Sequence, residues 1–206
     1  MAQVRPYRGI EAPDRLAARR DQLLQAGLDL LGAAPEPVDV TVRAVCQRAE
    51  LTPRYFYESF ADKDEFIGTV FDTVIAALAT TTQAAMAAAP PEDRTHACMA
   101  DIVHSITGDP RIGRLVFSTQ VTNAVLVRKR HESTALFAML SGQYAGVTLA
   151  LSANERLTAT AYFVVGGVGQ AITAWLDGQV TLTPEAMVDQ LTAIIEALGK
   201  PRLFRD

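Results

Sequence analysis

The chain has 206 residues, 49% of them hydrophobic and 20% charged, with a formal net charge of −4. These proportions exclude an intrinsically disordered protein and allow one large or two small domains. Residues 1–63 hold as many acidic as basic residues. The charge therefore neither requires nor excludes nucleic-acid binding, which needs only a local basic surface.

Two further features of composition bear on chemistry and location. Cys46 and Cys98 lack metal-ligand spacing, so we predict buried hydrophobic residues rather than ligands or a disulfide. Residues 1–20 are polar and arginine-rich, and no apolar stretch of the kind found in a signal peptide follows them. We expect a cytoplasmic protein without a cofactor or a metal ion.

The first part of the chain is predicted to be an arm followed by a helix. Proline and glycine discourage a helix in residues 1–14. Arg5 and Arg8 in this arm have two interpretations: contacts in a DNA minor groove, or a solvated terminus without a ligand. A helix is predicted from Asp14 to Leu31, ended by the prolines of the AAPEP sequence.

The segment from Thr41 to Phe66 predicts two short helices, a tight turn and the start of a third helix. Val42, Val45, Cys46 and Ala49 fall at i, i+3, i+4 and i+7, which is one apolar face of a helix. The N-cap residue of that helix is predicted to be Thr41.

The second short helix carries the hydrogen-bonding side chains. Thr52 is its predicted N-cap, and Pro53 stands at the first helical position, where its missing N–H costs nothing. Phe56 and Phe60 are four residues apart and form the inner face. The residues left on or near the outer face are Arg54, Tyr55, Tyr57, Glu58 and Ser59. This is the plan of a helix-turn-helix.

The same segment resembles the DNA-binding domain of the TetR family of bacterial transcription regulators, whose pattern is roughly T-V-x-x-I-A-x-x-A-G-V-S-x-x-x-x-Y-x-x-F-x-x-K-x-x-L. The positions of the pattern fall on Thr41, Val42, Val45, Cys46, Ala49, Leu51, Thr52, Tyr57, Phe60, Lys63 and Phe66. The departures are Cys46 for alanine, Phe66 for leucine and Glu50 for the turn glycine. A residue other than glycine at φ > 0 costs about 1 kcal/mol, so we expect a slightly re-formed turn.

A DNA-binding site follows from this plan and from the resemblance. The first turn after Thr52 is placed to enter a major groove, where Arg54 and Tyr55 are predicted to contact bases and Arg54 to make a bidentate contact to guanine. The resemblance implies phosphate contacts from Tyr57 and Lys63. The whole predicted set is Thr41, Arg43, Thr52, Pro53, Arg54, Tyr55, Tyr57 and Lys63. The alternative is a solvated set of helix faces without a ligand.

A long helix follows the helix-turn-helix. Asp62 as N-cap and Glu65 three residues later resemble a capping box. Apolar residues then recur at helical spacing from Ile67 to Leu78, up to the break at Pro90. One face must therefore pack on the helix-turn-helix while the far end enters a second core. We expect a lever between residues 1–63, the arm and DNA-binding domain, and residues 64–206, an effector-binding and dimerisation domain.

The rest of the chain shows helical spacing and no strand-like alternation. The predicted fold is all-α, with an N-terminal three-helix DNA-binding domain, a C-terminal helical ligand-binding and dimerisation domain, and about nine helices. The later helices are expected at about 92–107, 110–117, 122–149, 153–177 and 183–198, with Ser152 as the cap of the fourth.

Residues 157–176 contain no charged residue and are long enough to span a membrane. Gln170, several hydroxyls and three glycines argue against that, so we predict a helix that is buried or lies at a dimer interface. Gly166, Gly167 and Gly169 follow no predicted strand and do not form a phosphate loop. Small residues instead let another helix approach closely. The resemblance implies a homodimer formed by the last two long helices of each subunit.

An effector pocket is expected in the C-terminal half, because pockets in helical bundles are mostly apolar with a few polar groups. The candidates are His104, Gln120, Asn123, Tyr144, Tyr162, Phe163, Gln170 and Trp175. Ordinary core or interface packing is the alternative for each. The few charges in these helices favour a largely apolar or aromatic effector. No H-E-x-x-H or G-x-S-x-G motif is present, and we do not expect an enzyme.

The sequence thus predicts a ligand-responsive repressor that binds a palindromic double-stranded DNA operator as a dimer and is released by a small effector. The alternative is a helical ligand-binding or scaffold protein, associated with a membrane, without sequence-specific DNA binding.

Overall fold

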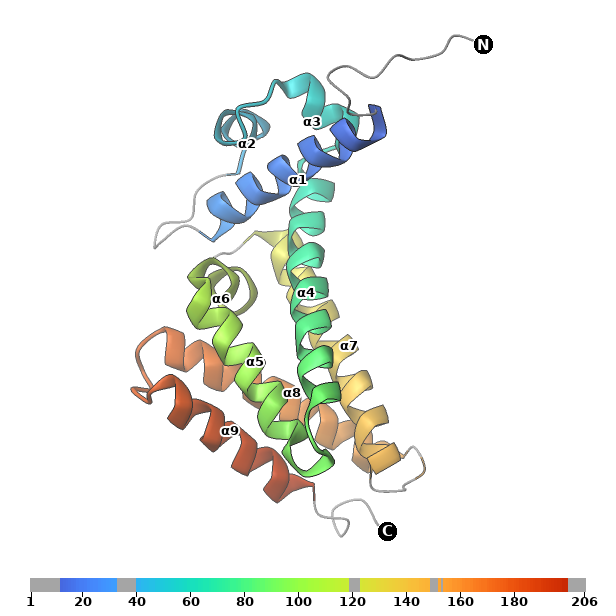
Figure 1. The fold of residues 1–206 in the computed structure, drawn as a ribbon, viewed down its shortest axis with the longest axis vertical. Coiled ribbons are helices and arrows are strands. Elements are labelled where there is room, and N and C mark those ends of the chain that lie inside the picture. The colour runs from blue at the N-terminus through green and yellow to red at the C-terminus, as the bar shows by residue number, and fades with distance from the viewer. Residues whose placement is uncertain (1–11, 33–39, 119–122, 149–151, 153, 200–206) are drawn as a thin grey trace.

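The computed structural model describes residues 12–32, 40–118, 123–148, 152 and 154–199, and all regular elements in these ranges are helices (Figure 1). Arg5, Arg8 and Gln120 lie outside the described residues. The elements are α1 (Ala12–Leu31), α2 (Val42–Arg48), α3 (Pro53–Ser59), α4 (Lys63–Ala88), the 3₁₀ turn η1 (Pro91–Asp93), α5 (Arg94–Gly108), α6 (Pro110–Phe117), α7 (Ala124–Thr148), α8 (Glu155–Leu176) and α9 (Pro184–Leu198). The all-α prediction is confirmed.

The helices α1, α2 and α3 lie together at one end of the molecule, around the start of α4 (Figure 1). The rings of Phe56, Phe60 and Phe66 pack with centroids 5.0–5.5 Å apart and are almost fully buried. A Cβ atom on Gly27 would lie 2.6 Å from Phe66 and Val70, so α1 crosses α4 at a distance that only glycine permits.

The turn between α2 and α3 keeps its left-handed residue although that residue is not glycine. Glu50 has φ of 53°. Its N–H donates to Gln47 O at 3.3 Å, and the N–H of Leu51 donates to Cys46 O at 2.9 Å. These two bonds form a Schellman motif, which satisfies the last carbonyls of α2. The expected re-forming of the turn is therefore wrong: the turn keeps a left-handed residue, and Glu50 itself adopts that conformation.

The long helix α4 begins with a modified capping box. Asp62 Oδ1 accepts from Glu65 N–H at 2.8 Å, while Glu65 Oε2 accepts from Ala61 N–H at 2.7 Å, one residue before the position that the motif predicts. The first apolar core includes α4 residues and also Leu115, Val125 and Leu126. This core therefore draws on both sides of the boundary expected at residue 63.

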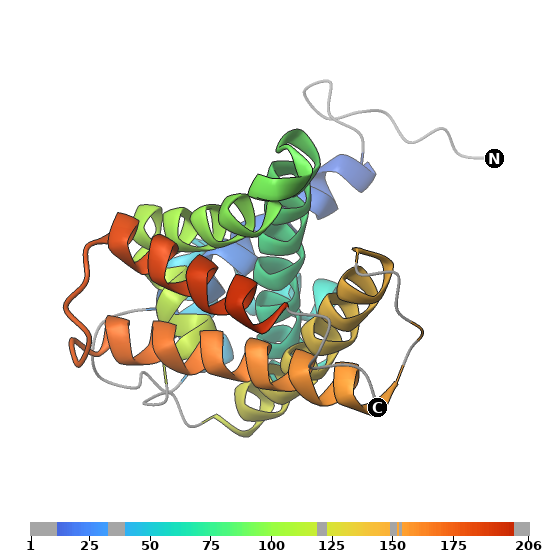
Figure 2. The same cartoon turned by 90° about the horizontal axis from the view of Figure 1, so that it is seen from below.

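A second core is built by α5, α8 and α9 around Val103, Ile106 and Ile172. The start of α8 differs from the prediction, because Asn154 and not Ser152 is its cap. Asn154 Oδ1 accepts from Leu157 N–H at 2.9 Å. Figure 2 shows α8 and α9 running beside each other on one side of the molecule.

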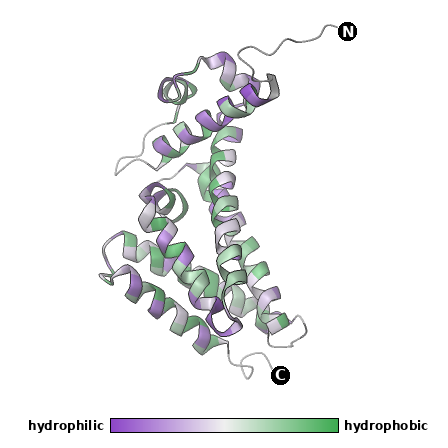
Figure 3. Ribbon diagram, viewed as in Figure 1, coloured by the Kyte–Doolittle hydropathy of each residue, from purple (hydrophilic) through white to green (hydrophobic). Residues whose placement is uncertain are grey.

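One face of helix α8 is not covered within the chain. Tyr162 is 48% and Phe163 is 67% exposed, and no atom lies within 4 Å of a Cβ built on Gly166 or Gly167. Of the two alternatives that the sequence offered, burial inside one subunit is wrong. Apolar residues are also visible along the lower parts of α4 and α7 (Figure 3). Both α4 and α8 are long and apolar enough to cross a membrane by length and composition alone, as core helices of soluble proteins also are.

Candidate DNA-binding surface and effector groove

The inner face of helix α3 is anchored in the core by one side chain. Phe56 is fully buried, and it fixes the helix so that Thr52, Pro53, Arg54 and Tyr57 remain exposed. Pro53 occupies the first turn as predicted, and Thr52 is the N-cap residue, but its side chain makes no capping hydrogen bond. The Thr52 hydroxyl is therefore not used to hold the start of this helix.

Arg54 is the most exposed charged group of α3 that has a defined ion-pair partner. Its side chain is 83% exposed, and its Nε donates to Glu58 Oε1 at 2.9 Å. A pair of this kind, one helical turn apart and open to water, is weak. Arg54 can thus exchange Glu58 for a base edge at little cost.

Tyr55 is placed differently from Arg54, because it is half-buried. The guanidinium of Arg19, from α1, lies 4.0 Å from the centre of its ring, which is the geometry of a cation–π contact. Arg20 of the same helix lies 4.7 Å from the ring centre of Phe60. Sequence reasoning assigned no role to these arginines, since nothing in the local pattern of α1 shows which ring each one meets.

The remaining predicted DNA-binding residues stand at helix starts. Thr41 caps α2, accepting from Ala44 N–H at 3.1 Å, and Arg43 is exposed in the first turn of that helix. Lys63 is the first residue of α4 and is half-buried. Helix N-termini carry unpaired N–H groups and a partial positive charge, which favour a phosphate nearby.

The candidate effector residues are not brought together. Asn123 Oδ1 accepts from Val125 N–H at 2.9 Å at the start of α7. Trp175 Nε1 donates to Leu182 O at 2.8 Å, which ties the α8–α9 turn to α8. Tyr162, Phe163 and Gln170 are exposed on α8, and Tyr144 is exposed on α7. Among the described candidates, His104 lines a hollow between helices.

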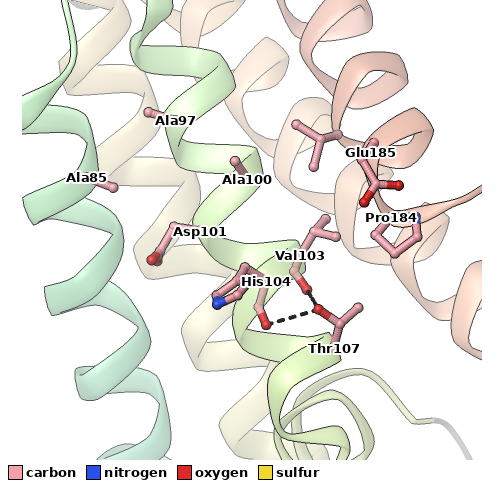
Figure 4. A pocket seen from close by; sticks show the side chains of 10 residues that line it. Ala85, Ala97, Ala100, Asp101, Val103, His104, Thr107, Pro184 and Glu185 are labelled. Carbon is pink, nitrogen blue, oxygen red and sulfur yellow. Dashed lines mark hydrogen bonds between the residues drawn. The ribbon is translucent and has the colours of Figure 1, made fainter.

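That hollow is an open groove of about 590 Å³ between the end of α4, α5 and the start of α9 (Figure 4). Its apolar lining comes from Ala85, Ala97, Ala100, Val103, Pro184 and Val188. Asp101, His104, Thr107 and Glu185 supply the polar groups. Asp101 Oδ2 already accepts from the hydroxyls of Thr81 and Thr82 at 2.8 and 2.7 Å. Two carboxylates beside an apolar floor disfavour a polyanion in this groove.

Neither cysteine is prepared for chemistry. Burial raises the pKa of the Cys46 thiol, and burial together with nearby Asp101 raises the pKa of Cys98 to about 11. Both thiols are free and stay protonated near neutral pH, so they are poor nucleophiles and poor ligands. Among the described residues no group of histidine, cysteine and carboxylate side chains is arranged to hold a metal ion.

Among known proteins, solved structures share the fold of this chain, whereas no sequence match is found. No family model and no curated protein matches the sequence. Solved structures do match: the fatty acid degradation regulator FadR from Bacillus halodurans, with TM-score 0.71 and 14% identity over 89% of this chain and 96% of that chain; and a TetR-like transcriptional regulator from Rhodococcus sp. RHA1, with TM-score 0.65 and 16% identity over 92% and 98%. FadR from Bacillus subtilis, in complex with stearoyl-CoA, matches with TM-score 0.64 and 11% identity over 85% and 96%.

This chain has the TetR-type fold. The matches cover both the helix-turn-helix end and the α5–α9 end, so the resemblance first drawn from residues 41–66 extends to the whole architecture. At 11–16% identity the likeness extends to the fold and not to individual side chains.

Proposed function

We propose that this chain is a transcription regulator that binds a palindromic operator as a homodimer through α2 and α3. The observation that carries the proposal is the exposed first turn of α3, with Thr52 and Arg54 held outward by the buried Phe56 in a TetR-type fold. The polar side chains that line the groove and the two protonated cysteine thiols offer no comparable support for catalysis.

Six of the eight predicted residues have a defined role in this proposal. Arg54 leaves Glu58 and reads a guanine edge by two parallel hydrogen bonds. Arg43 and Tyr57 bind phosphates, together with Lys63 at the start of α4, and Thr41 fixes the first turn of α2. The ring of Tyr55 is partly covered by Arg19. Its exposed part is proposed to contact a base edge in the DNA major groove.

The dimer is proposed to form through α8 and α9. In α8, Tyr162 and Phe163 lie one helical turn before Gly166 and Gly167. Large and small residues therefore lie side by side on an uncovered face. Such a face is complementary to itself across a two-fold axis. Ile194 of α9 is a further exposed apolar residue, at 44%. Large exposed apolar surfaces of this kind mark interaction sites.

The effector is proposed to be a small, largely apolar molecule. The protein is proposed to act as a repressor, which effector binding releases from the operator. Recognition helices of a dimer must lie about 34–36 Å apart to read successive major-groove faces. A tilt of α4 caused by a ligand changes that spacing. Such release needs different ligand affinities of the two states.

The test is selection of bound sequences from a random double-stranded DNA pool at a stated salt concentration. The proposal expects a palindrome whose half-sites are one helical turn apart. Arg54→Ala should then weaken binding by about 1–3 kcal/mol and relax the preference at one position. Arg128→Ala, an exposed arginine of α7 paired with Glu132, is the matched control and should bind as the parent does. Recovery of no specific sequence by the parent protein would refute the proposal.

A further inference from the structure

The short helix α6 is attached to the rest of the molecule at both ends. Ile112, Leu115 and Val116 pack in the first core, with α1 and α4. Phe117, at the other end, packs in the second core with α5, α8 and α9. The eight residues of α6 therefore contact the helix-turn-helix end and the effector end directly.

The C-terminal carbonyls of α6 are bound by helices of the effector end. Arg130 of α7 donates from Nη2 to Leu115 O at 2.7 Å. Thr173 of α8 donates from Oγ1 to Phe117 O at 3.1 Å. These bonds use carbonyls that a helix end leaves without partners in its own backbone, so a shift of α7 or α8 acts on α6.

The N-terminal end of α6 meets the C-terminal end of α1 at backbone distance. A Cβ atom on Gly32 would lie 2.5 Å from Arg111 Cβ and 2.8 Å from Arg111 Cα. The Nε of Arg114 donates to Gly32 O. No larger residue fits at position 32 without displacing α6, so α1 and α6 are in close contact at this joint.

A line of charges continues from this joint into the helix-turn-helix. Arg111 Nη2 binds Asp109 Oδ2 at 2.6 Å, and Arg111 Nη1 donates to Asp29 Oδ1. The other oxygen of Asp29, Oδ2, accepts from Arg48 of α2, at 2.7 Å from Nε and 2.6 Å from Nη2. Each oxygen of one carboxylate thus serves an arginine from a different part of the molecule.

This division has a mechanical consequence. Asp109 directs the guanidinium of Arg111 and also caps α6 by accepting from the N–H of Arg111 at 3.0 Å, so Arg111 moves with α6. A displacement of α6 away from α1 would make Arg111 pull on Oδ1 and rotate the carboxylate. Rotation removes Oδ2 from Arg48, because the two oxygens are rigidly joined. Helix α2 then loses its charged contact with α1.

We propose that Arg111 is a positioning residue that makes the placement of α2 depend on α6, with Asp29 as the shared link to Arg48. The side-chain bonds of Arg111 described above go to Asp29 and Asp109, so we expect an effect of its removal on α2 to pass through Asp29. The regulatory use of this link rests on the DNA-binding function proposed above; the link itself does not.

The test is hydrogen exchange of the full-length dimer, resolved to the amides of α1, α2 and α3. In Arg111→Gln we expect the hydrogen-bonded amides of α2 and its cap to exchange at least about fivefold faster than in the parent protein. The amides of α1 and α3 should stay within about twofold of the parent, which is the error of such a comparison. Arg48→Gln should give the same pattern. Adding it to Arg111→Gln should add little, since both remove one link. Arg128→Gln is the surface control.

Two results overturn the inference: α2 exchange unchanged in Arg111→Gln, or faster exchange in all three helices alike, which is ordinary destabilisation. If Arg111→Gln does not fold, Arg111→Lys keeps the charge but not the fork, and the same two criteria apply to it. With an operator in hand, Arg111→Gln should also bind it about fivefold more weakly or worse. Exchange needs no DNA, so failure of the operator search and failure of this link are separate results.

Discussion

Replacing Glu50 by glycine should stabilise the protein. Glu50 has φ of 53°, in the left-handed region where an L-residue with a Cβ atom costs about 1–2 kcal/mol. Glycine removes that cost but gains conformational freedom in the unfolded chain, which offsets about 0.5–1 kcal/mol. The expected gain is therefore about 0.5–1 kcal/mol, or roughly 1–4 °C in Tm for a chain of this size.

The comparison that isolates this effect is Glu50→Gly against Glu50→Ala. Both remove the exposed carboxylate, but alanine keeps the Cβ atom that is strained at this φ. Unfolding in urea, followed by far-UV circular dichroism at one fixed protomer concentration, gives the two free energies of unfolding. Helix content and the Schellman bonds of the Cys46–Leu51 turn should be the same in both. A glycine variant no more stable than the alanine variant would refute the assignment of a left-handed residue at this turn.

Three further predictions concern packing, assembly and pH. Gly27→Ala should lower the free energy of unfolding by about 1–3 kcal/mol, measured by the same urea titration, since its Cβ would meet Phe66 and Val70 at 2.6 Å; no loss would mean that α1 and α4 are further apart. Phe163→Lys should shift the dimer toward monomer in sedimentation velocity without loss of helix content, and an unchanged dimer would place the interface elsewhere. Burial alone would raise the pKa of Asp29, but hydrogen bonds from Arg48 and Arg111 hold it below its ordinary value of 3.8. The stability it contributes is thus present above that value and lost as pH falls through its folded-state pKa. Asp29→Asn should destabilise the protein at neutral pH, and that difference should disappear on acidification below 3.8; a difference independent of pH would show that the carboxylate charge is not involved.

Local chemistry explains why most of the fold was predictable. Thr41 and Asp62 cap their helices within three residues, and Pro53 starts α3. Bonds of this range depend only on neighbours in the chain. The predicted cap of α8 was wrong, because Asn154 and not Ser152 caps it. Ser152 and Asn154 are both good capping residues, and local sequence alone does not distinguish between them.

The candidate site divides in the same way. The sequence placed Arg54 on the outer face of α3 by its spacing from Phe56, and the structure leaves it 83% exposed. The half-buried state of Tyr55 was not predictable, because it depends on Arg19 from another helix. The groove around His104 also needs α4, α5 and α9 together, so no single stretch of sequence indicates it.

By itself, then, the sequence determined the helices, their caps and the helix-turn-helix, since these follow from contacts three or four residues apart. Only the tertiary structure decided that α8 is uncovered within one chain, that Glu50 tolerates a left-handed backbone, and that Asp29 joins Arg48 to Arg111. The last of these bonds links residues 82 positions apart. The direction in which α1 and α6 cross brings them together, and that direction is set by the packing of side chains from several helices at once.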